Sequence, residues 1–309
     1  VREYLMQVAE YWIREYDIDG WRLDVPTEIT TEGFWEEFRK RVRAVKADAY
    51  LVGEIWHDAP QWLQGDRFDA TMNYVFAAAA IAFAGGERVS QALVDDRSYD
   101  PYPGIDAPTF GKRIAALFDQ YAWETTQVQF NLLGSHDAPR VLSIARGDKA
   151  TLQLATLLQM TFPGTPVIYY GDEIALRGTK RYDRGHRDQD ARWPFPWHDE
   201  SVWDAETHKF VRDAVALRRE HAALRHGDFI QVFASGSQFL FLRDDERERL
   251  LVAINAGEDS AAVRLEDFKN SFAVKNVRPL FGSAEAVVYD DHVEIKLPAR
   301  SAGVFLILG

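Results

Sequence analysis

The chain has 309 residues, and its formal net charge of −12 at pH 7, with no basic run to offset it, argues against a nucleic-acid partner and favours a neutral or cationic ligand. Hydrophobic residues make up 47% of the chain and aromatic residues 13%, which is enough for a large globular core, yet no apolar run approaches the roughly 20 residues that a membrane helix needs. The absence of cysteine excludes disulfide bonds and fits a reducing compartment, so we expect a cytoplasmic protein without a membrane partner.

The first predicted element is a helix over residues 1–16. Large apolar side chains recur along one side of it at helical spacing; they are Tyr4, Leu5, Val8, Tyr11, Trp12 and Tyr16. A helix with so broad an apolar face needs another segment to cover it. We therefore expect this chain to be a portion of a longer protein, with the covering segment before Val1.

Strand-like and helix-like segments alternate after this helix. Short β-branched or aromatic runs predict strands at 19–25, 50–56, 67–72, 128–134 and 165–171. Longer stretches between them predict helices, for example at 31–46, 110–122 and 148–162. This alternation predicts a parallel sheet, in either a barrel or a doubly wound α/β fold. The run TPVIYY at 165–170 agrees, because so uniformly hydrophobic a strand is expected to have both faces covered.

The pattern of the sequence changes after a predicted helix at 202–221. Short alternating strands with turns between them follow, in the runs FIQVFASG, SQFLFLR, RLLVAINAG, AAVRL, VVYDDHVEIKL and SAGVFLIL. They predict an antiparallel β-sandwich packed after the last helix. We therefore expect an α/β domain at 1–224 and an all-β domain at 225–309.

The stretch DGWRLDV at 19–25 carries two opposite charges in an otherwise apolar strand. Side chains alternate between the faces of a strand, so Arg22 and Asp24 share one face and lie side by side. Burial of such charges costs several kcal/mol per ion unless they pair, and a paired arginine keeps the aspartate ionised at neutral pH. An aspartate held in this way can act as a nucleophile, although a structural ion pair at a strand end fits the same residues.

Three acidic residues fall at the predicted carboxyl ends of three different strands: Asp24, Glu54 and Asp137. The carboxyl ends of parallel strands gather on one face, where barrel enzymes place their catalytic groups. Each acid alone could be a helix cap or a stray charge. Together with the neighbouring Arg22 and His136, they indicate one catalytic site.

Cleavage of a sugar acetal requires this combination of groups. One ionised carboxylate attacks, and one protonated carboxyl group supplies a proton to the leaving oxygen. Arg22 lowers the pKa of Asp24 and suits it as the nucleophile, whereas the apolar neighbours Val52, Ile55 and Trp56 are expected to raise the pKa of Glu54 by desolvation and keep it an acid.

Four blocks of the sequence resemble successive motifs of the α-amylase superfamily, in its neopullulanase, cyclomaltodextrinase and maltogenic amylase branch. They are GWRLDV, VGEIWHDAPQWLQGDRFDATMNY, LLGSHDAPR and FPGTPVIYYGDEI. The resemblance implies an α/β (β/α) TIM barrel, with only the last five of its eight strands in this chain, followed by the all-β sandwich. It implies that Asp24 is the nucleophile, Glu54 the general acid and base, and Asp137 the group that stabilises the transition state.

The same resemblance implies an α-glucan or maltooligosaccharide substrate, no cofactor, and no metal site among the residues present. It assigns substrate binding to Arg22 and His136 around the cleaved sugar, to Glu28, Trp56 and His57 on the acceptor side, and to Asp188 and Arg192 on the donor side.

This sequence departs from the family's pattern in two ways. Pro26, Thr27 and Ala138 stand where the branch usually has other residues, which could change acceptor preference. The first three barrel strands and an early motif whose side chains flank the scissile sugar are expected before Val1. We therefore expect the amino-terminal half of the barrel, from the same gene or a second chain, to be a necessary partner, and this chain alone to be inactive.

Several functions remain open at this point. The leading hypothesis is a retaining hydrolase of α-1,4 links in cyclodextrins, pullulan or maltooligosaccharides. A glucanotransferase or α-glucosidase is the alternative within the class, and a noncatalytic sugar-binding or regulatory barrel is the alternative outside it. A doubly wound nucleotide-binding enzyme is not supported, because no GxGxxG or phosphate loop follows any predicted strand.

Overall fold

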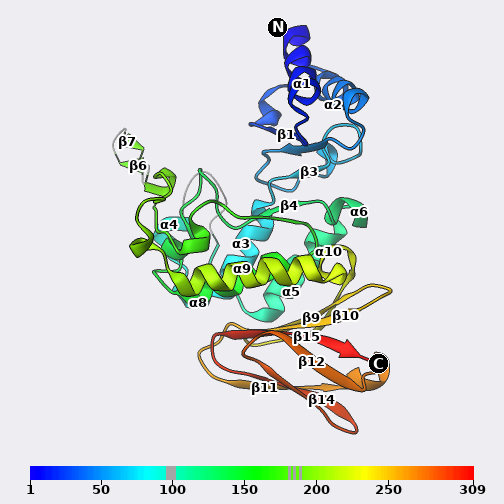
Figure 1. Ribbon diagram of the computed structural model, residues 1–309, viewed down its shortest axis with the longest axis vertical. Helices are drawn as coiled ribbons and strands as arrows, with labels where there is room; N and C mark the ends of the chain where they lie inside the picture. Colours follow the sequence, from blue (N-terminus) through cyan, green and yellow to red (C-terminus); the bar gives the residue numbers. More distant parts are fainter. Residues whose placement is uncertain (95–101, 180–181, 184–185, 188–189) are drawn as a thin grey trace.

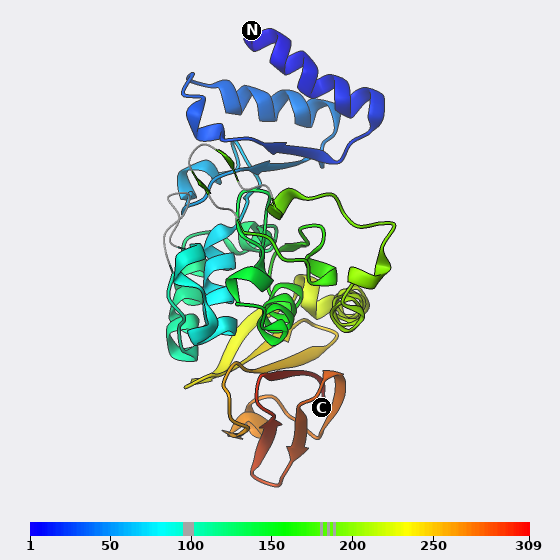
Figure 2. The same ribbon diagram turned by 90° about the vertical axis from the view of Figure 1, so that its left-hand side faces the viewer.

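The computed structural model describes residues 1–94, 102–179, 182–183, 186–187 and 190–309. The molecule is elongated, with the N-terminus at one end and the β-sandwich that contains the C-terminus at the other (Figure 1). Between them lies a layer of helices, so that parallel strands, helices and sandwich follow one another along the long axis (Figure 2).

Short strands alternate with helices through the first two thirds of the chain. In chain order these elements are α1 (Arg2–Tyr16), β1 (Gly20–Leu23), α2 (Phe34–Val45), β2 (Tyr50–Gly53), β3 (Ala70–Thr71), α3 (Tyr74–Gly85), α4 (Gln91–Val94), α5 (Ala107–Asp119), α6 (Trp123–Thr126), β4 (Phe130–Leu132), α7 (Val141–Ile144), α8 (Lys149–Thr161), β5 (Thr165–Val167), β6 (Tyr182–Asp183), β7 (His186–Arg187), α9 (Ala205–Glu220) and α10 (Ala222–His226). The predicted strands are present but shorter than the sequence runs that indicated them.

The strands β1 to β5 run parallel in chain order. β1, β2 and β3 form one sheet, and β4 and β5 form another. A parallel bridge between Met72 and Phe130 joins the two sheets. Because consecutive parallel strands lie side by side with helices between them, their carboxyl ends open on a common side, as predicted.

The first helix uses a different face from the one that its sequence pattern suggested. Met6, Ala9 and Ile13 are its buried residues, and α1 packs against α2 through them. Trp12 and Tyr16, on the predicted apolar face, are 43% and 59% exposed. The broad aromatic side of α1 is therefore uncovered in this chain.

The prediction that β5 has both faces covered is wrong for this chain. Ile168 and Tyr170, at the end of the TPVIYY run, are 40% and 38% exposed. β5 pairs with β4, and within the described residues no second strand pairs with it. A hydrophobic run of this kind stays exposed when the element that would cover it is not in the chain.

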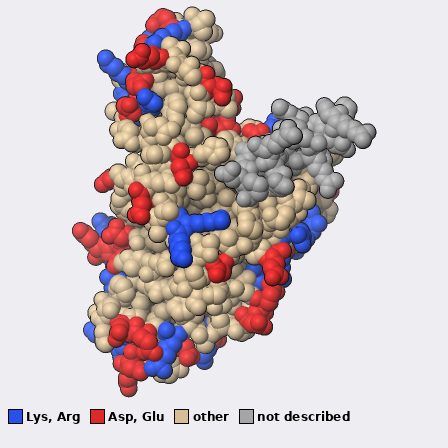
Figure 3. All heavy atoms as spheres, turned by 180° about the vertical axis from the view of Figure 1, so that it is seen from behind, with Lys and Arg blue, Asp and Glu red and all other residues tan. Residues whose placement is uncertain are grey.

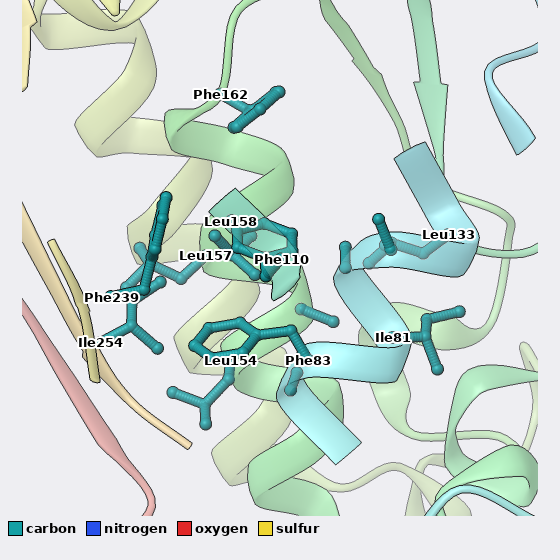
Figure 4. Packing of buried hydrophobic residues seen from close by; sticks show 14 of the residues in the cluster. Ile81, Phe83, Phe110, Leu133, Leu154, Leu157, Leu158, Phe162, Phe239 and Ile254 are labelled. Atoms are coloured by element: carbon teal, nitrogen blue, oxygen red, sulfur yellow. The ribbon is translucent and has the colours of Figure 1, made fainter. Parts of the chain in front are cut away.

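The largest hydrophobic core lies between the helical layer and the first sheet of the sandwich. Ile81 and Phe83 on α3, together with Phe110 on α5, contact one side of this core (Figure 4). Phe239 packs edge-on against the Phe110 ring at 4.8 Å from the all-β side. Helices and sandwich therefore share one core.

The carboxyl-terminal region is a β-sandwich, as predicted. Its elements are β8 (Asp228–Ser235), β9 (Gln238–Asp244), β10 (Arg249–Asn255), β11 (Ala261–Glu266), α11 (Phe268–Ser271), β12 (Asn276–Gly282), β13 (Glu285–Val288), β14 (His292–Leu297) and β15 (Ser301–Leu308). A five-stranded sheet in the order β12-β15-β10-β9-β8 faces a three-stranded sheet in the order β11-β14-β13. The predicted domain boundary after residue 224 falls inside α10 and stays a prediction.

Strand β12 was not predicted from the sequence. It contains Pro279, and its pairing with β15 shifts between Pro279 and Phe281. Proline cannot donate a backbone hydrogen bond and is tolerated mainly on edge strands or at bulges. β12 meets both conditions, because it is the edge strand of its sheet and carries the irregularity.

Candidate active site

Two of the predicted catalytic acids leave the sheet next to each other. In the parallel pair β1–β2, Leu23 lies opposite Gly53. Asp24 and Glu54 are the next residues along the two strands, so the pairing brings them to the same end of the sheet. The backbone N–H of Glu54 donates to the carbonyl of Leu23 at 2.9 Å and fixes this position.

Arg22 forms ion pairs with both acids. Its Nη1 lies 2.7 Å from Oδ1 of Asp24, and its Nη2 lies 2.7 Å from Oε1 of Glu54. The second contact is an ion pair without well-aligned hydrogen-bond geometry, since no N–H of Nη2 points at an acceptor. Arg22 Nε also donates to the sulfur of Met72 at 3.3 Å. The guanidinium group is therefore held between β1, β2 and β3.

The two carboxyl groups lie in different surroundings. Asp24 has a side chain that is 76% exposed, whereas the Glu54 side chain is 4% exposed. The Arg22 guanidinium, followed by a hydrogen bond with the Glu54 carboxyl group and the charge of His136, holds the pKa of Asp24 below its ordinary value. Both acids are therefore held by the same guanidinium group.

The backbone directly after Asp24 is strained. Val25 adopts φ 30° and ψ 54°, a left-handed conformation that costs a β-branched residue roughly 1–3 kcal/mol. Its N–H donates to Oε2 of Glu54 at 3.1 Å, and the carbonyl of the next residue, Pro26, accepts from Nε1 of Trp35 at 2.9 Å. These contacts fix the conformation of the turn that follows Asp24. The strained residue therefore lies next to the two acids, where the turn determines their orientation.

Asp137 lies in the loop after β4. His136 Nε2 is 2.9 Å from Oδ2 of Asp137, and Arg192 Nη2 donates to Oδ1 at 2.7 Å. Arg192 Nε donates to the carbonyl of His136 at 2.7 Å. The charge of His136 also contributes to the lowered pKa of Asp24, after the larger effects of Arg22 and Glu54.

Tyr74 connects the two parts of the site and was not predicted. Its ring stacks on Trp56 with centroids 3.7 Å apart, and its hydroxyl donates to Ser135 Oγ at 2.9 Å. Burial raises the pKa of Tyr74, and the charges of Glu54 and Asp137 add to that rise. Its place at the start of α3, shortly after the predicted strand at 67–72, is the sequence signal that could have found it.

A cavity of about 410 Å³ adjoins this pair of rings. It is lined by Trp56, His57 and Tyr74, by Ala138 next to Asp137, and by small and aliphatic side chains of α3 and α5. Asp58 and Arg113 are the charged residues of this lining, so the cavity walls are largely apolar. On the molecular face in Figure 3, Lys or Arg side chains lie near the centre, and Asp and Glu side chains are scattered around them.

The remaining predicted residues are less closely tied to the acids. Glu28 is exposed on the 3₁₀ turn η1 (Pro26–Glu28), four residues after Asp24. His57 is exposed beside the half-buried Trp56. Asp188 lies outside the described residues. The structure therefore joins Asp24, Glu54 and Arg22 in one group of contacts, and Asp137, His136 and Arg192 in a second. That the two groups form one catalytic site stays a prediction.

Among the described residues, no group of three or more His, Cys, Asp or Glu side chains is arranged to hold a metal ion. In the part of the chain that the structure describes, no helix has both the length and the apolar composition to cross a bilayer.

Comparisons with known proteins agree on one family. The α-amylase catalytic-domain family model matches residues 1–251. A cyclomaltodextrinase of Geobacillus thermopakistaniensis is 40% identical over 265 residues, which are 85% of this chain and 41% of that protein. Neopullulanase 2 of Thermoactinomyces vulgaris is 37% identical over 269 residues, 86% of this chain and 41% of its own length. A crystal structure of the debranching enzyme of Nostoc punctiforme is 43% identical with a TM-score of 0.89, covering 98% of this chain and 61% of that one.

The chain belongs to the α-amylase family, whose fold is a (β/α) barrel and whose named relatives are glycoside hydrolases. Within that family it falls in the cyclomaltodextrinase, neopullulanase and maltogenic amylase branch, as the sequence motifs indicated. The chain spans about two fifths of the length of these curated relatives.

The electrostatic role of Arg22 can be tested without catalysis. Arg22→Met should raise the pKa of Asp24, because the group that most strongly stabilises its ionised form is removed. An NMR titration of the Asp24 carboxyl carbon should therefore show its midpoint at higher pH than in the wild type. Arg264→Met is the control, since it removes an exposed guanidinium that pairs with Glu266 and Asp291 in the sandwich. An unchanged Asp24 midpoint in Arg22→Met would contradict the role of Arg22.

Proposed function

We propose that this chain carries the catalytic acids of a retaining α-glucan hydrolase that cleaves α-1,4-glucosidic bonds through a covalent glycosyl-enzyme. The observation that carries the proposal is that a single guanidinium group, that of Arg22, pairs with both Asp24 and Glu54. Closely spaced carboxyl groups are a feature of retaining glycosidases, whereas inverting enzymes need a wider gap for a water molecule.

The geometry supports a double displacement. Asp24 attacks the anomeric carbon as the bond to the leaving oxygen breaks, and Glu54 transfers its proton to that oxygen. Glu54, now ionised, takes a proton from water, whose oxygen attacks the same carbon and releases Asp24. Arg22 favours the ionised form of Asp24, and the buried Glu54 side chain lies against the same guanidinium group.

Asp137 suits a substrate-holding role. His136 and Arg192 orient its two oxygens, which would leave the carboxylate ready to bind hydroxyl groups of the cleaved sugar. The names of the relatives, cyclomaltodextrinase and neopullulanase 2, support cyclodextrins, pullulan and maltooligosaccharides as substrates. We extend those substrates to this chain as part of the proposal.

We further propose that the amino-terminal half of a barrel completes the site. Five parallel strands are present among the described residues, Ile168 and Tyr170 just after the outer strand β5 are exposed, and α1 exposes Trp12 and Tyr16. Three additional strands with their helices would cover these surfaces and close the barrel.

Two other points stay predictions. They are the division into barrel and sandwich near residue 224 and a cytoplasmic location.

This part of the proposal predicts that the 309 residues are inactive alone. Mixing them with a separately expressed amino-terminal half of a cyclomaltodextrinase-type barrel should restore hydrolysis of cyclodextrin or a chromogenic maltoside, because the missing strands supply the rest of the pocket. We call this mixture the complemented enzyme. The rate should depend on the concentration of both halves. Hydrolysis by the chain alone at the rate of the complemented enzyme would contradict the proposal.

Glucan transfer is a second candidate, favoured by the cavity beside Trp56 and His57. An acceptor sugar or alcohol bound there would compete with water for the glycosyl group on Asp24. Product analysis of the complemented enzyme separates the two reactions, because transfer gives longer or new glycosides whereas hydrolysis gives only shorter glucans.

A further inference from the structure

A fully buried arginine lies three residues after Asp137. Arg140 is 1% exposed, and its Nη1 donates to the carbonyl of Tyr170 at 2.7 Å and to Oδ1 of Asp172 at 3.0 Å. Its Nη2 donates to the carbonyl of Ala191 at 3.0 Å. The guanidinium also lies over the Tyr169 ring, 4.7 Å from its centroid. One side chain therefore connects the loop after β4, the loop after β5 and the segment at residue 191.

The segment at residue 191 returns to the catalytic loop. Ala191 belongs to the 3₁₀ turn η5 (Asp190–Arg192), and its carbonyl also accepts from the hydroxyl of Tyr169 at 3.0 Å. The next residue, Arg192, donates to the carbonyl of His136 and to Oδ1 of Asp137, both at 2.7 Å. The loop that carries Asp137 is thus connected twice to η5, through Arg140 and through Arg192.

Asp172 keeps the Arg140 guanidinium in this orientation. It lies in the 3₁₀ turn η4 (Asp172–Ile174) and is 8% exposed. Burial raises the pKa of Asp172 to about 7, with a smaller contribution from Glu173, although the Arg140 cation opposes that rise. A Cβ atom at Gly134 would meet Oδ2 of Asp172 at 2.8 Å, so the chain just before His136 packs directly on this carboxyl group.

We propose that Arg140 is a positioning residue for Asp137: by fixing the carbonyl of Ala191 it places the Arg192 guanidinium on the Asp137 carboxylate. The effect of Arg140 on catalysis rests on the proposed function, whereas its hydrogen bond to the Ala191 carbonyl is a property of the fold. Arginine is required because its planar guanidinium reaches three acceptors on two other segments at once. Lysine has a single compact ammonium group and cannot span them.

Hydrogen exchange tests this contact without any activity. In the 309-residue chain, Arg140→Lys should speed amide exchange in a peptide covering 190–199 by about tenfold or more, because the turn loses its anchor. Exchange in α3 and α5 should stay unchanged. Arg249→Lys is the matched control, since Arg249 binds Asp244 and the Phe272 carbonyl inside the sandwich. Unchanged exchange at 190–199, or faster exchange throughout the chain, would overturn the proposal.

Tyr169→Phe provides a second variant in case Arg140→Lys fails to fold. It removes only the other hydrogen bond to the Ala191 carbonyl and keeps the ring beneath Arg140. We expect the same local increase in exchange at 190–199, smaller at roughly two- to fivefold, with unchanged exchange elsewhere. No increase at 190–199 would again overturn the proposal.

A kinetic cycle in the complemented enzyme separates positioning from general stability. Arg140→Lys and Arg192→Lys should each lower kcat by about tenfold or more, and the double variant should be no slower than Arg192→Lys alone, because Arg140 acts through Arg192. Additive losses would overturn the proposal. Failure of the proposed function would look different: the complemented enzyme would lack glucan hydrolysis while exchange at 190–199 still increased.

Discussion

Replacing Asp24 with asparagine should lower kcat of the complemented enzyme by roughly 10⁴-fold or more, the scale of loss when a nucleophile is removed. The amide has nearly the same shape as the carboxyl group but cannot attack the anomeric carbon. Asp24 is exposed and free of dense packing, so the variant should fold. Release of the chromophore from an aryl maltoside, measured under saturating substrate, checks the result.

The control for this variant is Asp19→Asn. Asp19 stands just before β1, pairs with Lys46 at 3.0 Å, and has a fully exposed side chain. It receives the same chemical change five residues from Asp24 and should keep wild-type activity. If Asp24→Asn retained activity within about tenfold of the wild type, Asp24 would not be the nucleophile.

Glu54→Gln should lower kcat on natural glucans by on the order of 10²- to 10⁴-fold, the usual contribution of a general acid. Glutamine preserves the volume of the buried side chain and an oxygen for the Val25 N–H. Maltooligosaccharide affinity, measured by calorimetry, should therefore change little. The loss should be much smaller on a glucosyl fluoride, because fluoride departs without a proton, and comparison of the two substrates isolates the acid step.

Glu36→Gln is the matched control for Glu54→Gln. Glu36 also pairs with an arginine, Arg67, at 2.8 Å, but it lies on α2 away from the acids. Equal losses of Glu54→Gln on glucan and on glucosyl fluoride would refute the assignment of Glu54 as the acid. A noncatalytic sugar-binding barrel would show binding without measurable turnover even in the complemented wild type.

The positions of the acids could be predicted because they depend on local rules. Side-chain alternation placed Arg22 next to Asp24, and the ion pair at 2.7 Å confirms it. The carboxyl ends of parallel strands meet on one side, which brought Glu54 to the same place. The lowered pKa of Asp24 follows from the same neighbour.

Contacts between distant segments could not be predicted in this way. The bridge from Arg22 to Glu54 depends on the register of β1 and β2, and the ring stack of Trp56 and Tyr74 on the path of the chain between β2 and α3. The link from Arg140 to Ala191 joins residues 51 positions apart. Such contacts are set by tertiary packing, for which one sequence carries no periodic signal.

The same limit explains the two wrong predictions about the fold. The pattern of α1 showed an apolar face but not which side of the helix meets α2, and Met6 and Ile13 are the residues that do. The TPVIYY run indicated a covered strand, yet Ile168 and Tyr170 are 40% and 38% exposed. Sequence pattern reports which residues can be buried, whereas burial requires a partner surface.

The central claim is that Asp24 forms a covalent bond to the sugar while Glu54 controls proton transfer. The most direct test is to trap that bond by treating the complemented Glu54→Gln enzyme with an α-maltosyl fluoride and analysing its peptic peptides by mass spectrometry. The account predicts a stable maltosyl adduct on the peptide that contains Asp24, absent in Asp24→Asn. An adduct on another residue, or direct release of the β-anomer without an adduct, would contradict it.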